Sequence, residues 1–275
     1  MSMLPPGHFY FDVLHELGAG GLGRVDKIKI TASNAVDKPI GSVWARKRLN
    51  EKWAENPTVT ARFEREIAAL KKMKHANIMT YEGENVPGGE RFYVMPCYES
   101  SVRHHVAGGT WSGQWREVAR CGATLADALA YAHGNGNIHR DLKPDNILFN
   151  GGGPLVIADW GLGYFVHKES VVLTQLTRGG MGTEYYCSME QWASGKCDGR
   201  GDIYSLGMTL NEWVTGRQLA LALVGVGVNS DTTSETSAGA QKFNALLRNM
   251  TELLRDNRPA SMTTVAAELR AAANA

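Results

Sequence analysis

The chain has 275 residues, of which 43% are hydrophobic and 21% are charged, and its formal net charge is +1. This composition is ordinary for a globular protein, and it excludes the strongly basic or acidic classes that bind nucleic acid or membrane surfaces through charge. Four scattered cysteines form no Cys-x-x-Cys pair, so we expect reduced thiols rather than a zinc site or a disulfide framework. The chain starts without the basic and apolar runs of a signal peptide, and its longest apolar stretch, 219–228, is too short to span a membrane. We therefore expect a cytoplasmic protein without a membrane segment or a nucleic-acid partner.

A glycine-rich turn joins the first two predicted strands, 10–17 and 26–30. Between them stand Gly18, Gly20 and Gly23. Glycine has no Cβ, so the backbone of such a turn can lie close over phosphate groups. The same Gly-x-Gly-x-x-Gly spacing occurs in dinucleotide-binding folds, but there a helix follows the glycines, whereas here a strand pattern follows. The pattern therefore favours a glycine-rich hairpin that covers a phosphate site, rather than a dinucleotide-binding turn.

The next predicted strand, 43–49, carries a lysine between two arginines. Alternation places Ala45 and Lys47 on one face of the strand and Arg46 and Arg48 on the other. A solvated basic cluster is the alternative interpretation of these three cations. The alternation favours a separate role for Lys47.

Residues 60–74 predict an amphipathic helix. Its apolar residues recur at helical spacing: Phe63, Ile67 and Leu70. Glu66 falls on the same side, and a buried carboxylate needs a cation, for which Lys47 is the candidate. Glu64 is the competing partner, but it falls on a different face from Leu70.

Two strand-like runs follow, around 80–82 and 91–95, and a long helix is predicted over 112–133. Apolar residues at helical spacing mark this helix: Trp115, Val118, Leu125 and Leu129. Short apolar strands are predicted at 147–149 and 155–158, and another helix begins near Asp202. The stretch 229–241 is rich in Ser, Thr and Gly, so we expect a loop there, followed by two or three short helices.

The loop at 139–146 reads His-Arg-Asp-Leu-Lys-Pro-Asp-Asn, and Pro144 stiffens its turn. This octapeptide resembles the catalytic loop of the eukaryotic-type, or Hanks-type, serine/threonine protein kinases. The resemblance implies that Asp141 accepts the proton of a hydroxyl group and that Asn146 holds a magnesium ion. Asp159, which opens an Asp-Trp-Gly sequence similar to the family's Asp-Phe-Gly, is the second implied ligand of Mg²⁺, with Mn²⁺ possible in its place.

The resemblance covers nearly the whole chain and implies a two-lobed α+β fold. A small β-rich lobe would extend to about residue 95, a hinge would occupy about 96–99, and a mainly helical lobe would follow from about 100 to 275. ATP would lie between the lobes, with Met95 at the back of its pocket and the Tyr98 backbone donating a hydrogen bond to adenine. The residues that the resemblance places around the nucleotide are Leu17, Gly18, Gly20, Gly23, Val25, Ala45, Lys47, Met95, Tyr98 and Leu148.

Other positions match the family in order. Residues 163–182 fit an activation segment, in which Thr177 is the first candidate for autophosphorylation and Thr174 the second, with Arg140 as the implied phosphate partner. Ser-Met-Glu replaces the family's Ala-Pro-Glu at the close of this segment, and Glu190 would pair with Arg258. Asp202 would brace the catalytic loop; a helix N-cap is the alternative interpretation of that aspartate.

The acceptor follows from one further pair of positions. In the serine/threonine branch, a lysine placed like Lys143 contacts the γ-phosphate and a threonine placed like Thr183. The resemblance therefore implies an enzyme that phosphorylates Ser and Thr of protein substrates. A kinase-like scaffold without activity and a small-molecule kinase of related fold remain as alternatives. Phosphorylation of a protein would exclude the scaffold, and preference for a peptide acceptor would exclude the small-molecule kinase.

Overall fold

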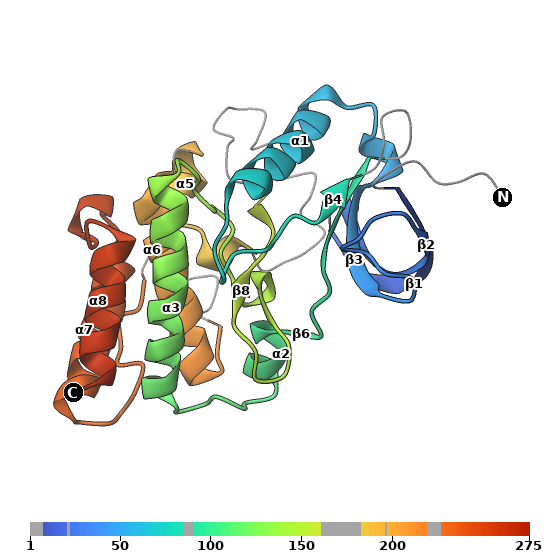
Figure 1. Ribbon diagram of the computed structural model, residues 1–275. Helices are drawn as coiled ribbons and strands as arrows, with labels where there is room; N and C mark the ends of the chain where they lie inside the picture. Colours follow the sequence, from blue (N-terminus) through green and yellow to red (C-terminus); the bar gives the residue numbers. More distant parts are fainter. Residues whose placement is uncertain (1–7, 21–22, 85–90, 161–182, 196, 219–226) are drawn as a thin grey trace.

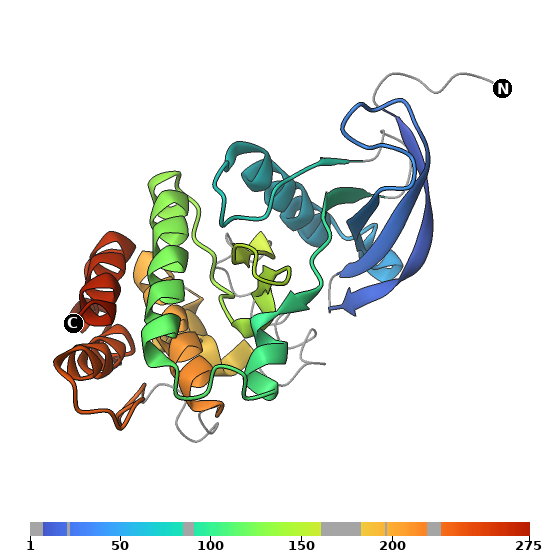
Figure 2. The same ribbon diagram turned by 60° about the horizontal axis from the view of Figure 1, so that its bottom comes forward.

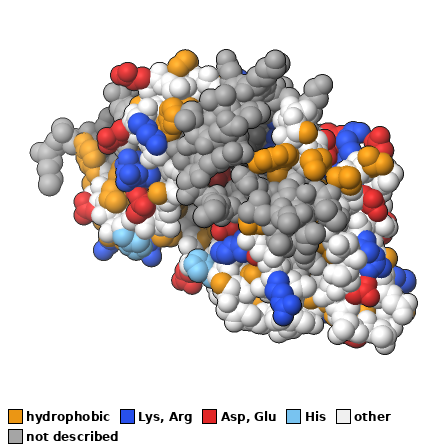
Figure 3. Space-filling model, turned by 180° about the vertical axis from the view of Figure 1, so that it is seen from behind, with side chains coloured by type: hydrophobic (Ala, Val, Ile, Leu, Met, Phe, Trp, Pro, Cys, Tyr) orange, Lys and Arg blue, Asp and Glu red, His pale blue; other side chains and the backbone are white. Residues whose placement is uncertain are grey.

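The computed structural model describes residues 8–20, 23–84, 91–160, 183–195, 197–218 and 227–275. Its N-terminal part is rich in strands and its C-terminal part is mainly helical, and the two parts lie side by side (Figures 1 and 2). This confirms the expected α+β division of the chain. On the face seen in Figure 3, acidic and basic side chains are interspersed, in keeping with the net charge of +1.

The N-terminal part is an antiparallel sheet of five strands in the order β1-β2-β3-β5-β4. The strands are β1 (Phe9–Ala19), β2 (Gly23–Ser33), β3 (Val43–Leu49), β4 (Gly83–Glu84) and β5 (Phe92–Pro96), with a short 3-10 helix, η1 (Glu51–Trp53), after β3. The strand expected around 80–82 was placed too early: Glu82 donates its N–H to the Val94 carbonyl of β5, and the strand itself, β4, begins at Gly83. Just before this point, Met79 donates its backbone N–H to Ile157 and so ties the chain to the C-terminal part.

Helix α1 (Pro57–Lys72) packs beside this sheet and starts with two local signals. The Asn56 side chain accepts from the backbone N–H groups of Thr58 and Val59, and Pro57 occupies the first turn, where no donor is needed. One face of the helix is buried: Val59, Arg62, Phe63, Glu66, Ile67 and Leu70. The expected amphipathic helix is therefore confirmed, with Glu66 on its buried side.

The loop at 139–146 leads into a second sheet, which has three strands. Its strands are β6 (Ser100–Ser101), β7 (Ile147–Phe149) and β8 (Val156–Ile157), and a 3-10 helix, η2 (Pro144–Asn146), leads into β7. Strands β7 and β8 are antiparallel, with Ile147 opposite Ile157. The residue before β7 and the residues after β8 therefore lie at the same end of the pair, and Ala158 donates its N–H to the Asn146 carbonyl. This register brings Asn146 and Asp159 together.

The C-terminal part is built on helices. They are α2 (Val102–Ala107), α3 (Trp115–Gly134), α5 (Met189–Ser194), α6 (Gly199–Thr215), α7 (Ala238–Met250) and α8 (Met262–Ala273), with 3-10 helices η4 (Thr183–Tyr186) and η6 (Arg255–Asn257). Residues 201–214 of α6 are all buried. Gly122 of α3 allows this close packing, since a Cβ there would meet Leu210 of α6 at 2.8 Å. None of the described helices is long and apolar enough to cross a lipid bilayer.

The loop expected over 229–241 was predicted to extend too far toward the C-terminus. Helix α7 already begins at Ala238, because the Ser237 side chain caps it by accepting from the backbone N–H of Ala240. The serine that suggested a loop is thus the signal for a helix start.

Candidate active site

Lys47 on β3 lies between two carboxylates from other elements. Its Nζ is 2.6 Å from Glu66 Oε1 on α1 and 2.8 Å from Asp159 Oδ1 just after β8. Glu66 is also held by the Tyr93 hydroxyl, which donates to Oε1 at 2.8 Å. Glu64, the competing partner from the sequence, is exposed and pairs with Arg91 instead. The structure thus places Lys47, Glu66 and Asp159 together.

The two arginines beside Lys47 point to the other face of the sheet, as alternation predicts. Arg46 and Arg48 both donate to the buried carboxylate of Asp26 on β2, and Arg46 also lies over the rings of Phe11 and Phe92. They stabilise the sheet on that side. Lys47 is therefore not part of a solvated basic cluster.

The pKa values of the triad follow from burial and mutual charge. Burial opposes the charge of Lys47, yet Asp159 and Glu66 raise its pKa well above the ordinary value. Burial also raises the pKa of Glu66, an effect that the Lys47 charge only partly offsets. Asp159 shows the opposite balance. Burial raises its pKa, but the effect of Lys47 is to lower it, and the pKa falls to about 2. Lys47 and Asp159 are therefore charged at neutral pH.

The loop after α3 places Asp141 among three neighbours. Lys143 Nζ lies 3.0 Å from Asp141 Oδ2, and Asn146 Nδ2 donates to both the backbone carbonyl and Oδ2 of Asp141, at 2.8 and 3.1 Å. Burial raises the pKa of Asp141, with Lys143 opposing the rise and Asp159 adding to it. A carboxylate with a raised pKa is a stronger proton acceptor than an exposed one.

Asp202 of α6 fixes the shape of this loop from below. Its Oδ2 accepts from the His139 backbone N–H at 2.8 Å and its Oδ1 from the Arg140 N–H at 2.7 Å. Arg140 adopts a φ of 66°, a left-handed conformation that is unfavourable for arginine and is held by these bonds. The helix N-cap is Asp198, so the capping interpretation of Asp202 is wrong.

Asp159, at φ 61°, is the second non-glycine residue with a left-handed backbone in the described part of the chain. The following Trp160 is buried and packs edge-on against the His139 ring, with 4.7 Å between ring centroids. Its indole N–H donates to the Ile157 carbonyl at 3.1 Å. A phenylalanine could fill the space but could not make this bond. The tryptophan therefore holds the turn that aims Asp159 at Lys47.

The glycine-rich hairpin is the tip of β1 and β2. Leu17 and Gly18 lie near the end of β1, which finishes at Ala19, and the Gly20 N–H donates to the Gly23 carbonyl at 2.8 Å. At Gly23 the reason for glycine is a close approach, because a Cβ there would lie 2.6 Å from the Arg48 carbonyl oxygen of β3. No atom of the described residues lies within 4 Å of the Cβ position of Gly18, so these surroundings do not require glycine.

Strand register gathers the other expected nucleotide contacts. Across β2, β3 and β5, Lys47 is paired with both Val25 and Tyr93. Two residues from Lys47 along β3, Ala45 is paired with Met95. Met95 is buried, and β5 ends at Pro96, before Tyr98. Leu148 lies on β7 of the second sheet.

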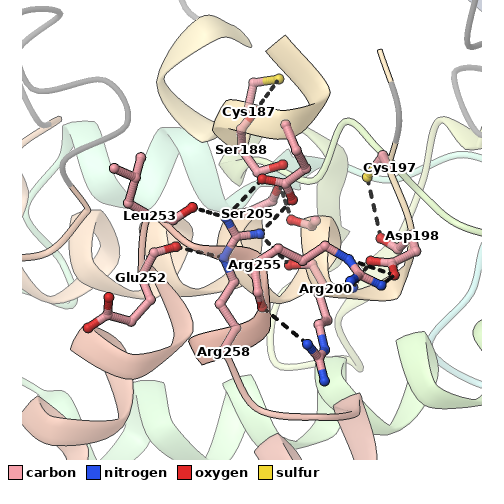
Figure 4. A network of polar contacts seen from close by, with 12 residues as sticks. Cys187, Ser188, Cys197, Asp198, Arg200, Ser205, Glu252, Leu253, Arg255 and Arg258 are labelled. Carbon is pink, nitrogen blue, oxygen red and sulfur yellow. Dashed lines mark hydrogen bonds and ion pairs between the residues drawn. The ribbon is translucent and has the colours of Figure 1, made fainter. Parts of the chain in front are cut away.

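Glu190 and Arg258 form the expected ion pair. The guanidinium makes two parallel bonds to the carboxylate, at 2.7 and 3.0 Å, and also donates to the carbonyls of Arg200, Glu252 and Leu253 (Figure 4). The Arg258 side chain is fully buried. Burial raises the pKa of Glu190, but the bonds to Arg258 lower it below the ordinary value. The pair ties α5 to the end of η6.

Arg258→Ala is expected to lower the free energy of unfolding by about 3–5 kcal/mol, because removing one partner of a buried ion pair leaves the other uncompensated. Arg255→Ala is the matched control, since the Arg255 pair with Asp198 is exposed and should contribute far less. Urea denaturation followed by tryptophan fluorescence measures both. Equal losses in the two variants would contradict the prediction.

Some of the expected positions lie outside the described residues. These are Thr174 and Thr177, together with the rest of the proposed activation segment, 163–182. Thr183 begins η4, but its side chain is outside the described part as well, so its contact with Lys143 stays a prediction.

The sequence did not point to three residues that hold the site. Tyr93 bonds Glu66, His133 donates from α3 to Asp202 with 2.8 Å between Nε2 and Oδ2, and Gln191 donates to the Arg140 carbonyl at 2.7 Å. Alternation along β5 could have found Tyr93, because it faces Lys47 across the sheet. For Gln191 no local pattern was available.

The chain matches the family model described as protein kinase domain over residues 11–267. A probable serine/threonine-protein kinase of Clostridium acetobutylicum is 27% identical over 75% of this chain. The serine/threonine-protein kinase PknD of Chlamydia pneumoniae and the probable serine/threonine-protein kinase PknB of Corynebacterium glutamicum are each 30% identical, over 74% and 73% of this chain. The matched regions span 30%, 24% and 30% of these three relatives, so this chain corresponds to less than a third of their length.

Proposed function

This chain belongs to the protein kinase domain family, and we propose that it transfers the γ-phosphoryl group of ATP to serine and threonine hydroxyls of proteins. The observation that carries the proposal is the position of Lys47, within hydrogen-bond reach of both Glu66 and Asp159. Phosphoryl transfer needs little covalent help from the protein, so catalysis comes mainly from positioning and charge stabilisation. This site supplies such oriented charges, those of Lys47, Glu66 and Asp159.

Two residues of the loop act on the acceptor. Asp141 orients the hydroxyl and takes its proton, and its burial makes it a better base. Lys143 holds the Asp141 carboxylate and extends positive charge toward the transferred phosphoryl group. Lys47, aligned by Glu66, binds the α- and β-phosphates.

Asn146 and Asp159 are the proposed ligands of Mg²⁺, or of Mn²⁺ in its place. The Asn146 amide nitrogen is engaged by Asp141, which leaves the amide oxygen as its metal-binding atom. Asp159 remains ionised because Lys47 lowers its pKa. Two oxygen ligands of this kind suit a hard cation that takes further ligands from phosphates and water. The ion would offset the charge of the phosphates.

The nucleotide is proposed to lie between the two lobes, with the hinge at 96–99 as the boundary. In support, β5 of the first sheet ends at Pro96 and β6 of the second begins at Ser100. The glycine-rich hairpin would cover the phosphates, and Ala45, Met95 and Leu148 would line the adenine pocket. Tyr98 would supply the backbone donor to adenine.

Incubation with γ-labelled ATP, Mg²⁺ and a generic basic protein tests the proposal. Label on serine or threonine of the protein is the expected result. Binding of ATP without any transfer would favour the scaffold, the alternative that the Asp-Trp-Gly and Ser-Met-Glu sequences suggest. Transfer to aminoglycosides but not to peptides would favour a small-molecule kinase.

Autophosphorylation within the activation segment is a further part of the proposal. Arg140 supports it, because its buried Nε and Nη1 have no hydrogen-bond partner among the described residues. Two such donors suit a phosphate, which accepts charge-assisted hydrogen bonds from arginine. Thr177 is the first candidate and Thr174 the second, and both lie outside the described residues.

Phosphatase treatment is expected to reduce activity about tenfold or more, and ATP is expected to restore it. The reason is that a phosphate paired with an arginine commonly orders such a segment. Mass spectrometry of the restored protein should find phosphate on Thr177 or Thr174. A Thr174→Ala/Thr177→Ala variant should stay at the low level. Full activity of that variant would exclude these two sites.

A further inference from the structure

Tyr93 of β5 reaches the Glu66 carboxylate of α1 from the sheet, in which β5 lies between β3 and β4. Its hydroxyl donates to Glu66 Oε1 at 2.8 Å, and Lys47 Nζ lies 2.6 Å from the same oxygen. Tyr93 is paired with Lys47 across β3 and β5, so the two side chains leave the same face of the sheet side by side. Two strands therefore hold one oxygen of α1, each through a different donor.

The contact between Tyr93 and α1 is buried and continues into ring packing. Tyr93 is 1% exposed and Glu66 is 4% exposed, so water cannot easily replace the hydroxyl as a donor. The Tyr93 ring packs against the ring of Phe63, three residues before Glu66 on α1, with 5.6 Å between the ring centroids. Tyr93 thus holds α1 through an apolar surface and through a hydrogen bond to a carboxylate, which is the stronger kind of hydrogen bond.

The hydroxyl differs from Lys47 in the number of groups that it serves. Lys47 is shared between Glu66 and Asp159, and it is also the proposed ligand of the ATP phosphates. A tyrosine hydroxyl has one proton to donate, and that of Tyr93 is committed to Glu66. Burial and the Glu66 charge raise the pKa of Tyr93 well above its ordinary value, so the hydroxyl keeps its proton. Glu66 therefore retains a donor when Lys47 turns to a phosphate.

We propose that Tyr93 is a positioning residue that keeps Glu66, and with it the middle of α1, against the sheet while Lys47 serves the nucleotide. The inference rests on the proposed phosphotransfer, and it adds which residue maintains the position of α1. A buried carboxylate is costly to leave without a donor, so loss of the hydroxyl should let Glu66 and α1 move away from the sheet. Lys47 would then lose its alignment toward ATP.

Amide hydrogen exchange of the full chain tests the inference without any phosphotransfer. Tyr93→Phe keeps the ring and removes only the hydroxyl, so exchange across 63–70 of α1 should become about tenfold faster or more, with α3 unchanged. Tyr131→Phe is the matched control, because the Tyr131 hydroxyl accepts from the Lys74 N–H, beyond the end of α1. It should leave exchange across 63–70 as in wild type. No acceleration in Tyr93→Phe, or equal acceleration of α1 and α3, would overturn the inference.

The Lys47→Met variant separates the two donors to Glu66. With the lysine gone, the Tyr93 hydroxyl still donates to the carboxyl group and should still hold α1. Adding Tyr93→Phe to Lys47→Met should therefore accelerate exchange across 63–70 by a further factor of about ten or more. Equal exchange in the single and the double variant would mean that the hydroxyl does not hold α1 by itself, and this result would also overturn the inference.

Steady-state kinetics measure the consequence for the proposed reaction. Tyr93 acts on ATP through Glu66 and Lys47, so Tyr93→Phe should lower kcat/KM for ATP about tenfold or more and leave the KM for a serine peptide unchanged. Tyr131→Phe should keep both values. In a Glu66→Ala background, Tyr93→Phe should cause no further loss, because the acceptor is gone. A full tenfold loss in that background would contradict a role through Glu66.

The two kinds of measurement separate this inference from the proposed function. If wild type transfers no phosphate to proteins, the proposed function fails, while α1-specific acceleration of exchange in Tyr93→Phe still supports the role of the hydroxyl. If wild type is an active kinase but exchange in α1 does not depend on the hydroxyl, the inference fails and the proposed function stands.

Discussion

Asp141→Asn is expected to lower kcat by a factor of about 10²–10⁴, the range in which a positioned general base contributes to catalysis. The substitution keeps the size of the side chain and its place in the loop. It removes the oxygen that Lys143 and Asn146 both contact and that would accept the hydroxyl proton. The KM for ATP should change little, because Asp141 faces the acceptor rather than the nucleotide.

Steady-state kinetics with a serine peptide measure this effect, and a nucleotide titration shows whether the variant still binds ATP. Asp256→Asn is the matched control, since Asp256 is a highly exposed aspartate of η6. A variant with more than a tenth of wild-type kcat would mean that Asp141 is not the base. Loss of ATP binding would mean instead that the loop had lost its shape.

Lys47→Met is expected to lower kcat by a factor of about 10²–10³, the usual cost of removing one preorganised charge from a transition state. Two contacts disappear at once, because Lys47 is the cation for both Glu66 and Asp159. Without it, the pKa of each carboxyl group should rise, and like charges would repel Asp159 from Glu66. The KM for ATP should increase as well, since Lys47 is the proposed phosphate ligand.

The same kinetics, with Lys29→Met as control, isolate the effect of the site. Lys29 is an exposed lysine of the neighbouring strand β2, paired opposite Val43. Residues that act together are not additive, so Lys47→Met/Glu66→Gln should be little slower than Lys47→Met alone. A double variant that multiplies the two losses would show that Glu66 acts independently of Lys47.

Local periodicity was sufficient for much of this site. Helical spacing chose Glu66 over Glu64, and strand alternation separated Lys47 from Arg46, because each rests on neighbours within one element. The catalytic-loop and Asp-Trp-Gly sequences were located by their resemblance to a known family. The register of β7 and β8 then explains how these two sequences come to lie together. The pairing itself could not be predicted from the sequence of either short strand.

Contacts between distant segments were beyond that reasoning. Arg103 meets Glu212 and Tyr186 only because α2, α6 and η4 converge, and a single arginine in an amphipathic run gives no sign of this. Asp202 was predicted from the resemblance, whereas its capping alternative followed from local propensity and failed. Ser237 shows the reverse case, in which a polar residue read as a loop signal is in fact a helix cap.

The attachment of the catalytic loop to Asp202 joins the site to the part of the molecule that is hardest to unfold. The amide groups of His139 and Arg140 bond to a carboxylate with no solvent exposure, on a helix buried along most of its length. Opening this loop would leave a buried carboxylate without these two hydrogen bonds, so we expect its opening free energy to be high. In the glycine-rich hairpin, on the largely exposed first strand, the described residues make exposed contacts, such as the bond that the Asn50 side chain donates to the Gly20 carbonyl at 3.1 Å. We therefore expect backbone amide exchange to be slower in the loop at 139–146 than in the described part of the hairpin.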